Sequence, residues 1–448
     1  MLGHLSPTQI IAAGLRPPPD LSTSLAATQA AWRFYANDAV TLPTLAGPLI
    51  DAARASVAAG ACDGTSHLLV ALDWSPLHYG GHAARADRVA LNNRKDLGYE
   101  LLTALAISDR DGSPLAPVCL ELRAADGTHS TRAAALLSDD ASQLDTLAPV
   151  MAHVAGLGLS PPGQTPVFVI DREADSVAHF RAWDAAGHRF IVRADDRPRV
   201  VHQGVTRPLG EVADLLSRRR AGGGGAAFAD VGEVSFEGRP ARQFVAETAV
   251  VLQRPARTHR VDKQTGKAVH KNVAGEPLSL RLIVSEVRDD RGNVLARWLL
   301  LTNLPPSAAP AATIALWYYW RWRIESYHKL LKGAGQQVEH WQQETAAALA
   351  RRLLVAAMAC VVVWRLARDE RPQAAELRGV LVRLSGRQMK RGANARGFTE
   401  PALLAGLGVL IPMLVLLEHH DLDHLRALAR DVLPDLHPPP TRTRGKRA

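Results

Sequence analysis

The sequence contains little cysteine. Only Cys62, Cys119 and Cys360 occur among its 448 residues. Their number is odd, their spacing is wide, and none stands near a histidine in a zinc-binding pattern. This excludes a disulfide framework, and we interpret all three as small buried side chains in a reducing cytoplasm.

Long apolar runs are also lacking. The two most apolar stretches, 353–364 and 401–417, stay below the ~20 residues that cross a membrane, and the second contains Gly406, Gly408 and Pro412. The N-terminus, MLGHLSPTQI, lacks the charged and then apolar build of a signal peptide. We therefore expect a soluble cytoplasmic protein without membrane contact, in which both stretches form buried helices.

An excess of acidic residues is absent as well. The chain has 53 Lys and Arg against 44 Asp and Glu, a formal net charge of +9. This balance favours a polyanionic partner, nucleic acid or an acidic membrane surface, and does not choose between them. Apolar residues make up 47%, enough for a sizeable core, and a chain of this length has room for several domains.

The apolar pattern divides the chain into regions. Residues 1–62 are rich in alanine at helical spacing, which predicts an N-terminal helical region. Residues 63–200 contain short apolar runs typical of buried strands. The expected elements are three strands at 68–72, 101–107 and 118–122 and a helix at 139–157. A strand at 167–170, a helix that ends near 186 and a strand at 190–192 follow. This order predicts an α/β fold with a ribonuclease-H-like catalytic core.

The sequence pattern changes twice in the rest of the chain. Residues 201–303 contain a glycine run and alternating segments, which predict a β-rich insertion. Residues 304–345 return to a core helix that begins near Ala311, and 346–448 are mostly helical and end in a Pro-rich basic tail, which we expect to be disordered.

Two acids follow predicted strands. Asp73 comes after the run 68–72, and Asp171 comes after 167–170 and opens the charged sequence DREAD. The ends of strands in an α/β sheet meet at one crevice, so distant side chains can converge there. A helix cap or a turn is the ordinary alternative for each aspartate alone.

A stripe of functional side chains follows one face of the helix near 318. Tyr318, Arg321, Glu325, Lys329 and Lys332 fall within a narrow arc at ~100° per residue. A carboxylate among a phenol and several cations suits metal and phosphate binding. The alternative is a solvated face with Glu325–Lys329 ion pairs, although the aromatic residues crowding this helix favour packing in a core.

These residues resemble a known family. Tyr318-x2-Arg321-x3-Glu325-x6-Lys332 is similar to the Tyr-Arg-Glu-Lys signature of the insertion-sequence-four family of DDE transposases. DREAD resembles its second-aspartate motif, ARWLLLTNLP at 297–306 its final insertion strand, and WRFYANDAV at 32–40 its N-terminal region. The likeness runs from about residue 25 to about 420, nearly the whole chain.

The resemblance implies a cut-and-paste DNA transposase. Asp73, Asp171 and Glu325 would be the catalytic triad and the ligands of two Mg²⁺ or Mn²⁺ ions, for which hard carboxylate oxygens are suited. The implied reactions are nicking of transposon ends, hairpin formation and strand transfer. The expected partners are double-stranded DNA, both ends and target, and a second copy of the chain on that DNA, in a bacterial cytoplasm and at the nucleoid.

The resemblance also assigns supporting residues. Trp298 would stack on a flipped base, although an ordinary strand aromatic is the alternative. Three arginines just beyond the strand after DREAD would contact the DNA backbone, or else are scattered surface residues. The full set expected to bind DNA is Tyr318, Arg321, Lys329, Lys332, Trp298, Arg193, Arg197 and Arg199.

Two other functions remain open at this stage. A transposase-derived protein could bind DNA and no longer cut it, although an intact triad disfavours this. A glycosidase also uses paired carboxylates, but its acids flank a sugar and need no basic helical stripe. Mg²⁺-dependent cleavage of end-sequence DNA distinguishes all three.

Overall fold

The structure is a computed structural model. It describes residues 21–62, 67–82, 84–91, 95–132, 143–160, 165–174, 176–219, 228–236, 238–261, 268–387 and 397–432. The contacts divide the chain into two compact units. One is Tyr35–Arg365, and the other combines Met1–Phe34 with Leu366–Ala448. The predicted basic tail lies outside the described residues.

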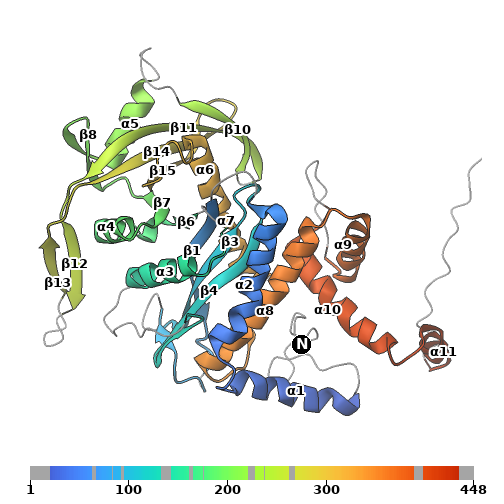
Figure 1. Ribbon diagram of the computed structural model, residues 1–448. Coiled ribbons are helices and arrows are strands. Elements are labelled where there is room, and N and C mark those ends of the chain that lie inside the picture. Colours follow the sequence, from blue (N-terminus) through green and yellow to red (C-terminus); the bar gives the residue numbers. More distant parts are fainter. Residues whose placement is uncertain are drawn as a thin grey trace, which may run out of the picture. The chain divides into compact units, whose positions relative to one another are not determined.

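The larger unit is a mixed α/β structure built on one large sheet (Figure 1). Its first part has the order β5-β4-β3-β1-β6-β7. Neighbours from β5 to β1 are antiparallel, and β1, β6 and β7 are parallel. The bounds are β1 His67–His78, β2 Val89–Ala90, β3 Leu97–Ile107, β4 Pro114–Ala124, β5 Gly127–Ser130, β6 Thr165–Ile170 and β7 Arg189–Ala194.

Strand β1 lies at the centre of this arrangement, which explains its sequence. Leu68 to Leu72 are all buried, as expected for a strand covered on both faces. The strand does not end at Asp73, as the apolar run suggested, but continues to His78. The reason is β3, whose residues pair with β1 as far as His78 opposite Gly98. The parallel partner β6 stops earlier, at Ile170 opposite Leu72.

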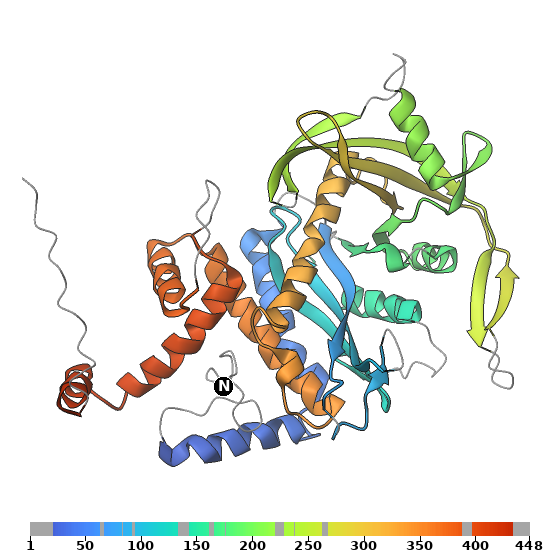
Figure 2. The same cartoon turned by 180° about the vertical axis from the view of Figure 1, so that it is seen from behind.

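The strands between 201 and 303 extend the same sheet. β15 joins β7 in antiparallel pairing, and the order continues β15-β14-β11-β8-β9, with β10 beside β11. The bounds are β8 Arg199–His202, β9 Val205–Pro208, α5 Leu209–Arg219, β10 Ala229–Phe236, β11 Arg239–Leu252, β14 Leu278–Arg288 and β15 Val294–Thr302. β12 (Ala256–Val261) and β13 (Ala268–Val273) form a separate two-stranded ribbon (Figures 1 and 2).

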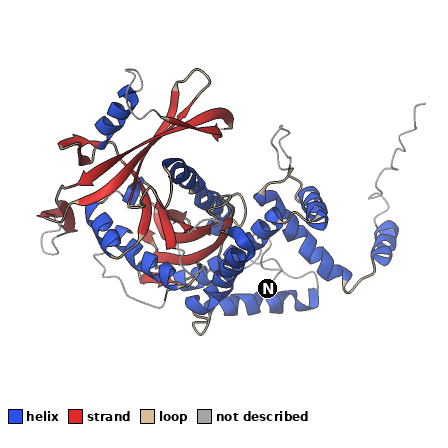
Figure 3. Cartoon of the chain, turned by 45° about the horizontal axis from the view of Figure 1, so that its top comes forward, coloured by secondary structure: helices blue, strands red, loops and turns tan. Residues whose placement is uncertain are grey.

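Helices cover the strands of the first part (Figure 3). α3 (Leu147–Gly156) and α4 (Val177–Ala185) lie on one side, while α2 (Leu42–Ser56) and α8 (Ala346–Arg368) lie on the other (Figure 1). Short helical turns complete this unit: η3 Val57–Ala61, η4 Gln143–Thr146, η5 Arg172–Ala174 and η6 Val338–His340.

The helix expected near Ala311 is divided in two. α6 (Ala311–Trp320) and α7 (Trp322–Leu331) meet at Arg321, where the backbone N–H bonds three residues back, to Tyr318. The β3–β4 turn contacts this junction. Gly112 has a positive φ of 68°, and a Cβ there would lie 2.4 Å from the Trp320 ring. Arg323 Nε donates to the Gly112 carbonyl at 2.9 Å, so turn and junction fit closely.

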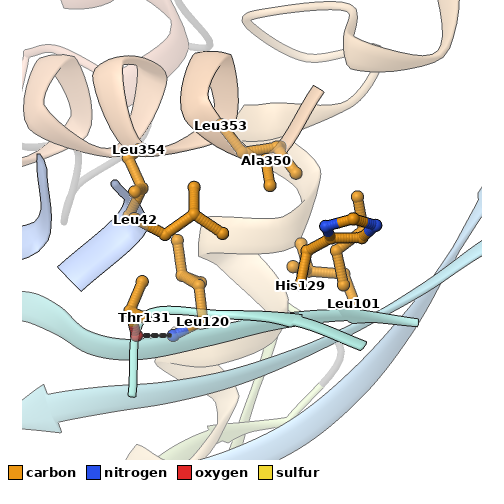
Figure 4. Close-up of a pocket in the computed structure, with 9 residues that line it drawn as sticks. Leu42, Leu101, Leu120, His129, Thr131, Ala350, Leu353 and Leu354 are labelled. Carbon is orange, nitrogen blue, oxygen red and sulfur yellow. Dashed lines mark hydrogen bonds between the residues drawn. The ribbon is translucent and has the colours of Figure 1, made fainter. Parts of the chain in front are cut away.

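A small apolar cavity lies in the larger unit between α8 and the strands β3 to β5 (Figure 4). The Thr131 hydroxyl at its edge accepts a hydrogen bond from Leu120 N. The lining is mostly aliphatic, so we interpret it as a packing gap and not as a substrate site: Leu42, Leu101, Leu120, Leu122, His129, Thr131, Ala350, Leu353 and Leu354.

The smaller unit is helical. It contains most of α1 (Leu21–Ala36), together with α9 (Pro372–Leu384), α10 (Glu400–Leu417) and α11 (Leu422–Val432). α10 packs closely on α9 at Gly406, where a Cβ would lie 2.2 Å from the Leu381 carbonyl oxygen.

The two most apolar stretches differ in burial. Both α8 and α10 have the length and composition of membrane-crossing helices. α8, with 23 residues, is longer than the apolar stretch 353–364 suggested. The apolar window of α8 is 83% buried, as expected of a core helix, but that of α10 is only 28% buried. The expectation of a buried helix is therefore wrong for the end of α10. The buried residues of α10 lie between Ala402 and Gly408, whereas Met413, Leu414 and Leu417 are exposed.

Candidate active site

The sheet register brings the two predicted aspartates to one level. Asp73 follows Leu72, and Asp171 follows Ile170, and these two preceding residues are partners in the parallel pair β1–β6. Adjacent strands lie about 4.8 Å apart, so the aspartates are neighbours despite their separation in sequence. Glu325 comes from α7, which packs against β1 and β3 (Figure 2).

Arg321 joins the three carboxylates. Its Nη2 atom lies 3.1 Å from Asp171 Oδ2 and 2.7 Å from Glu325 Oε1, and its Nη1 atom lies 3.5 Å from Asp73 Oδ2. The arginine side chain is only 2% exposed, while the three acids are 18% to 32% exposed. A single guanidinium therefore fills the centre of the predicted triad.

The two aspartates differ electrostatically. Burial raises the pKa of Asp73 to about 6, and the nearby Asp171 and Glu325 add to this, although Arg321 opposes it. Burial alone would also raise the pKa of Asp171, but Arg321, the Arg172 backbone N–H and other neighbours hold it below its usual value. The cluster therefore concentrates negative charge that needs a cation.

Two further side chains orient Asp171. The Tyr318 hydroxyl donates to Asp171 Oδ1 at 3.1 Å, and Arg193 Nη1 lies 3.7 Å from the same oxygen. Tyr318 is 3% exposed, and burial raises the pKa of its phenol, so the hydroxyl keeps its proton. Both residues were expected to bind DNA, and both contact a carboxylate here.

His328 is a site residue that the sequence analysis did not single out. Its Nδ1 atom lies 4.0 Å from Asp73 Oδ2, and its Nε2 atom lies 3.3 Å from Thr103 Oγ1. Burial lowers the pKa of His328 to about 3, aided by Lys332 and Arg321, so the ring is neutral at pH 7. Its position one helical turn after Glu325 could have indicated from the sequence that His328 lies near the site.

The donor set suits a hard divalent cation, because three carboxylates supply the oxygens that Mg²⁺ and Mn²⁺ prefer. In the described ranges, however, no three His, Cys, Asp or Glu side chains are arranged to hold a metal ion. The guanidinium of Arg321 explains this, since it lies between the acids. The three carboxylates have the chemistry of a metal site. In this arrangement, the position between them is occupied by the Arg321 guanidinium.

No contact described for the two predicted lysines joins them to the three carboxylates. Lys329 is exposed on α7. Lys332 donates to the Pro76 carbonyl and lies 3.9 Å from Glu339 Oε1. Glu339 also accepts a hydrogen bond from His78 N at 3.0 Å. Lys332 is therefore held at the far end of β1.

The other predicted DNA contacts are dispersed. Arg197 and Arg199 are exposed after β7, and Arg199 donates to the Thr206 carbonyl at 3.3 Å. Trp298 is half-buried on β15, with its ring centroid 6.3 Å from that of Phe236. No interaction described for these three residues joins them to the carboxylate cluster.

Comparison with known proteins identifies the family. The family model described as the transposase DDE domain matches residues 64–362, which include all three carboxylates. A solved structure of the piggyBac transposase synaptic complex with hairpin DNA is similar over 84% of this chain and 58% of that chain, at 8% sequence identity and a TM-score of 0.29. That likeness is too low to carry an argument. The family match spans more than half of the sequence, and the chain therefore belongs to the transposase DDE domain family.

Proposed function

We propose that this transposase is a metal-dependent DNA nuclease and strand transferase that moves its element by cut and paste, with Asp73, Asp171 and Glu325 as its catalytic triad. The observation that carries the proposal is the meeting of three carboxylates at one point, from two adjacent strands and a helix. Their membership of the matched family region supports it.

The order of the central strands supports a ribonuclease-H-like core. Three antiparallel strands, β3 to β5, lie on one side of β1, and the parallel strands β6 and β7 lie on the other. In such an open sheet, side chains beyond the ends of adjacent parallel strands gather at one crevice. We assign Asp73 and Asp171 to that crevice and the strands after 201 to an insertion.

The proposed chemistry is phosphodiester displacement. Asp73, Asp171 and Glu325 would hold two Mg²⁺ or Mn²⁺ ions, which when bound lower the pKa of water and stabilise the leaving oxygen. In the first reaction, a water oxygen bonds to phosphorus, the 3′ oxygen leaves and takes a proton, and a 3′-OH remains at the transposon end. That 3′ oxygen then loses its proton and bonds to a phosphorus of the opposite strand, whose flanking 3′ oxygen leaves as a hydroxyl, which gives a hairpin. Water opens the hairpin by the same displacement, and the freed 3′-OH attacks a phosphorus of the target, where another 3′ oxygen leaves.

The residues around the triad have distinct proposed tasks. Tyr318 and Arg193 would hold Asp171 in place, and the neutral His328 would limit the movement of Asp73 without adding charge. Trp298 would stack on a base displaced at the hairpin step. Lys329, Lys332, Arg197 and Arg199 would contact phosphates of end or target DNA.

The test is a cleavage assay on the protein's own element. Inverted repeats that flank the gene would supply the end sequence, and a scrambled duplex of equal composition is the control. We expect nicks at the end with Mg²⁺, none with EDTA, and none in the scrambled duplex. Binding of end DNA without cleavage under any divalent metal would favour the alternative, a DNA-binding protein derived from a transposase.

A further inference from the structure

Among the buried arginines that the structure describes in the larger unit, Arg321 reaches three carboxylates. Arg132 and Arg288 each pair with one, Glu121 and Glu286. Arg351, for comparison, donates to the backbone carbonyls of Val40 and Tyr35 as well as to Asp38. The hydrogen bonds described for the Arg321 guanidinium go only to carboxylates, those of Asp171 and Glu325. Arg351 is thus a structural clamp, whereas Arg321 depends on the charge of the triad.

The bonding capacity of Arg321 is only partly used. In the described part of the chain, its buried Nε and Nη1 atoms have no hydrogen-bond partner, although Nη1 lies 3.5 Å from Asp73 Oδ2. A buried donor without a partner carries a desolvation cost. The guanidinium therefore gains from a second arrangement in which an anion with several oxygens, such as a phosphate, meets its donors.

Charge counting points in the same direction. The cluster combines three acids with one guanidinium at its centre, so the acids outnumber the cation that neutralises them. Two divalent cations would neutralise the three acids without help, and a guanidinium left among them would then be repelled. Arg321 and the metal ions cannot both occupy the space between the same oxygens.

We propose that Arg321 is an internal counter-ion: it occupies the carboxylate cluster in the DNA-free protein and competes with divalent cations for it. This inference rests on the proposed function, since it takes the triad to be the metal site. Metal binding releases the guanidinium, and a DNA phosphate beside the site accepts it. DNA and metal therefore strengthen each other's binding, and the DNA-free protein holds metal weakly.

The experiment measures Mn²⁺ binding to the DNA-free protein, by the loss of the free Mn²⁺ signal in electron paramagnetic resonance. We expect Arg321→Gln to bind Mn²⁺ at least about tenfold more tightly than wild type, because the variant lacks the competing charge. The matched control is Arg123→Gln, which removes an equal charge that pairs with Glu100, outside the cluster, and is 52% exposed. Its affinity should change less than about threefold, because exposed charges are screened.

A second variant guards against misfolding of the first. Arg321→Lys keeps the charge but cannot span three carboxylates with its single ammonium, and should bind Mn²⁺ more tightly than wild type by a smaller factor. Adding Asp171→Asn to Arg321→Gln should remove the gain. Unchanged or weaker Mn²⁺ binding in both Arg321 variants overturns the counter-ion role. If neither they nor the wild type bind Mn²⁺ at all, the assignment of the triad as metal ligands fails as well.

Discussion

At the scale of single residues, Lys332 is a cation expected to contact DNA that already has partners within the protein. Its ammonium donates to the Pro76 carbonyl and lies 3.9 Å from Glu339 Oε1. Glu339 has another partner as well, His78 N. The acid therefore opposes any phosphate that approaches Lys332.

Glu339→Gln should strengthen binding of end DNA by about twofold to fivefold, in the range of one partly exposed ion pair. The glutamine oxygen can still accept from His78 N, so local structure should persist. Affinity would be measured by fluorescence anisotropy at fixed salt, against Glu376→Gln, which removes an exposed acid of α9. An equal gain in both variants would show that only net charge matters.

Asp109, which is not part of the triad, makes the free energy of unfolding depend on pH. It is 5% exposed, and hydrogen bonds from its own backbone N–H, the Cys62 thiol and the His67 backbone N–H offset the cost of its burial only in part. Burial raises its pKa to about 6, above the ~3.9 of an unfolded chain. Between these two pH values the folded protein binds more protons than the unfolded chain. The free energy of unfolding therefore falls as pH rises from about 4 to about 6, and above about 6 it falls no further on account of this residue.

Asp109→Asn should remove this loss. We expect stabilisation by about 1–3 kcal/mol at pH 7.5 and a smaller difference at pH 4.5, measured by urea unfolding at both values. Asp51→Asn, at an exposed position on α2, is the control and should shift neither midpoint appreciably. Destabilisation at pH 7.5 would mean that the ionised carboxylate has a partner that asparagine cannot replace.

At the scale of elements, the sequence of the segment that contains β12 and β13 is rich in basic residues. Arg181 on α4 fixes its base, where the guanidinium donates to the carbonyls of Leu252, Arg254 and Glu276. From 254 to 273 the sequence has one acid, Asp262, against six basic residues: Arg254, Arg257, Arg260, Lys263, Lys267 and Lys271. A two-stranded ribbon of this charge suits a DNA groove.

Replacing Arg257 and Arg260 of β12 by serine should weaken DNA binding and make it less sensitive to salt. Each lost phosphate contact lowers the slope of log affinity against log salt by about 0.9. The measurement is a salt titration of end-DNA binding, with the double variant Arg54→Ser and Arg123→Ser, at exposed positions on α2 and β4, as the control for total charge. An unchanged slope in the double variant would remove the ribbon from the DNA surface.

Elements also show what the sequence could and could not predict. The runs 68–72 and 167–170 are strands because both are buried on two faces, which a continuous apolar run reveals. The extension of β1 to His78 depends on pairing with β3, and the joining of β15 to β7 links residues about a hundred positions apart. The local sequence pattern indicates neither of these two strand pairings.

The candidate site follows the same division. Strand position indicated that Asp73 and Asp171 could converge, and the family resemblance added Glu325 to them. Contacts with Arg321 bring all three together. Periodicity placed Arg321 on the same helix face, but it could not show that the side chain is buried among the acids. Which groups pack against a face is decided by other segments of the chain.

At the scale of the whole molecule, the proposal includes cutting by a dimer that forms on DNA. The family resemblance implies that one subunit binds an end while its partner cuts it. A mixture of Glu325→Gln subunits with triad-intact subunits carrying Arg197→Glu and Arg199→Glu should then restore cleavage that neither shows alone. Efficient cutting of one isolated end by a monomer at high dilution would contradict this scheme.

The central claim is that three carboxylates perform the chemistry while other residues hold the DNA. Its most direct test is single-turnover nicking of end DNA by Asp73→Asn, Asp171→Asn and Glu325→Gln, with DNA affinity measured on the same preparations. The account predicts that each variant loses at least about a thousandfold in nicking rate, about 4 kcal/mol, and binds DNA within about threefold of wild type. Mg²⁺-dependent nicking at the wild-type rate by pure Glu325→Gln would contradict it.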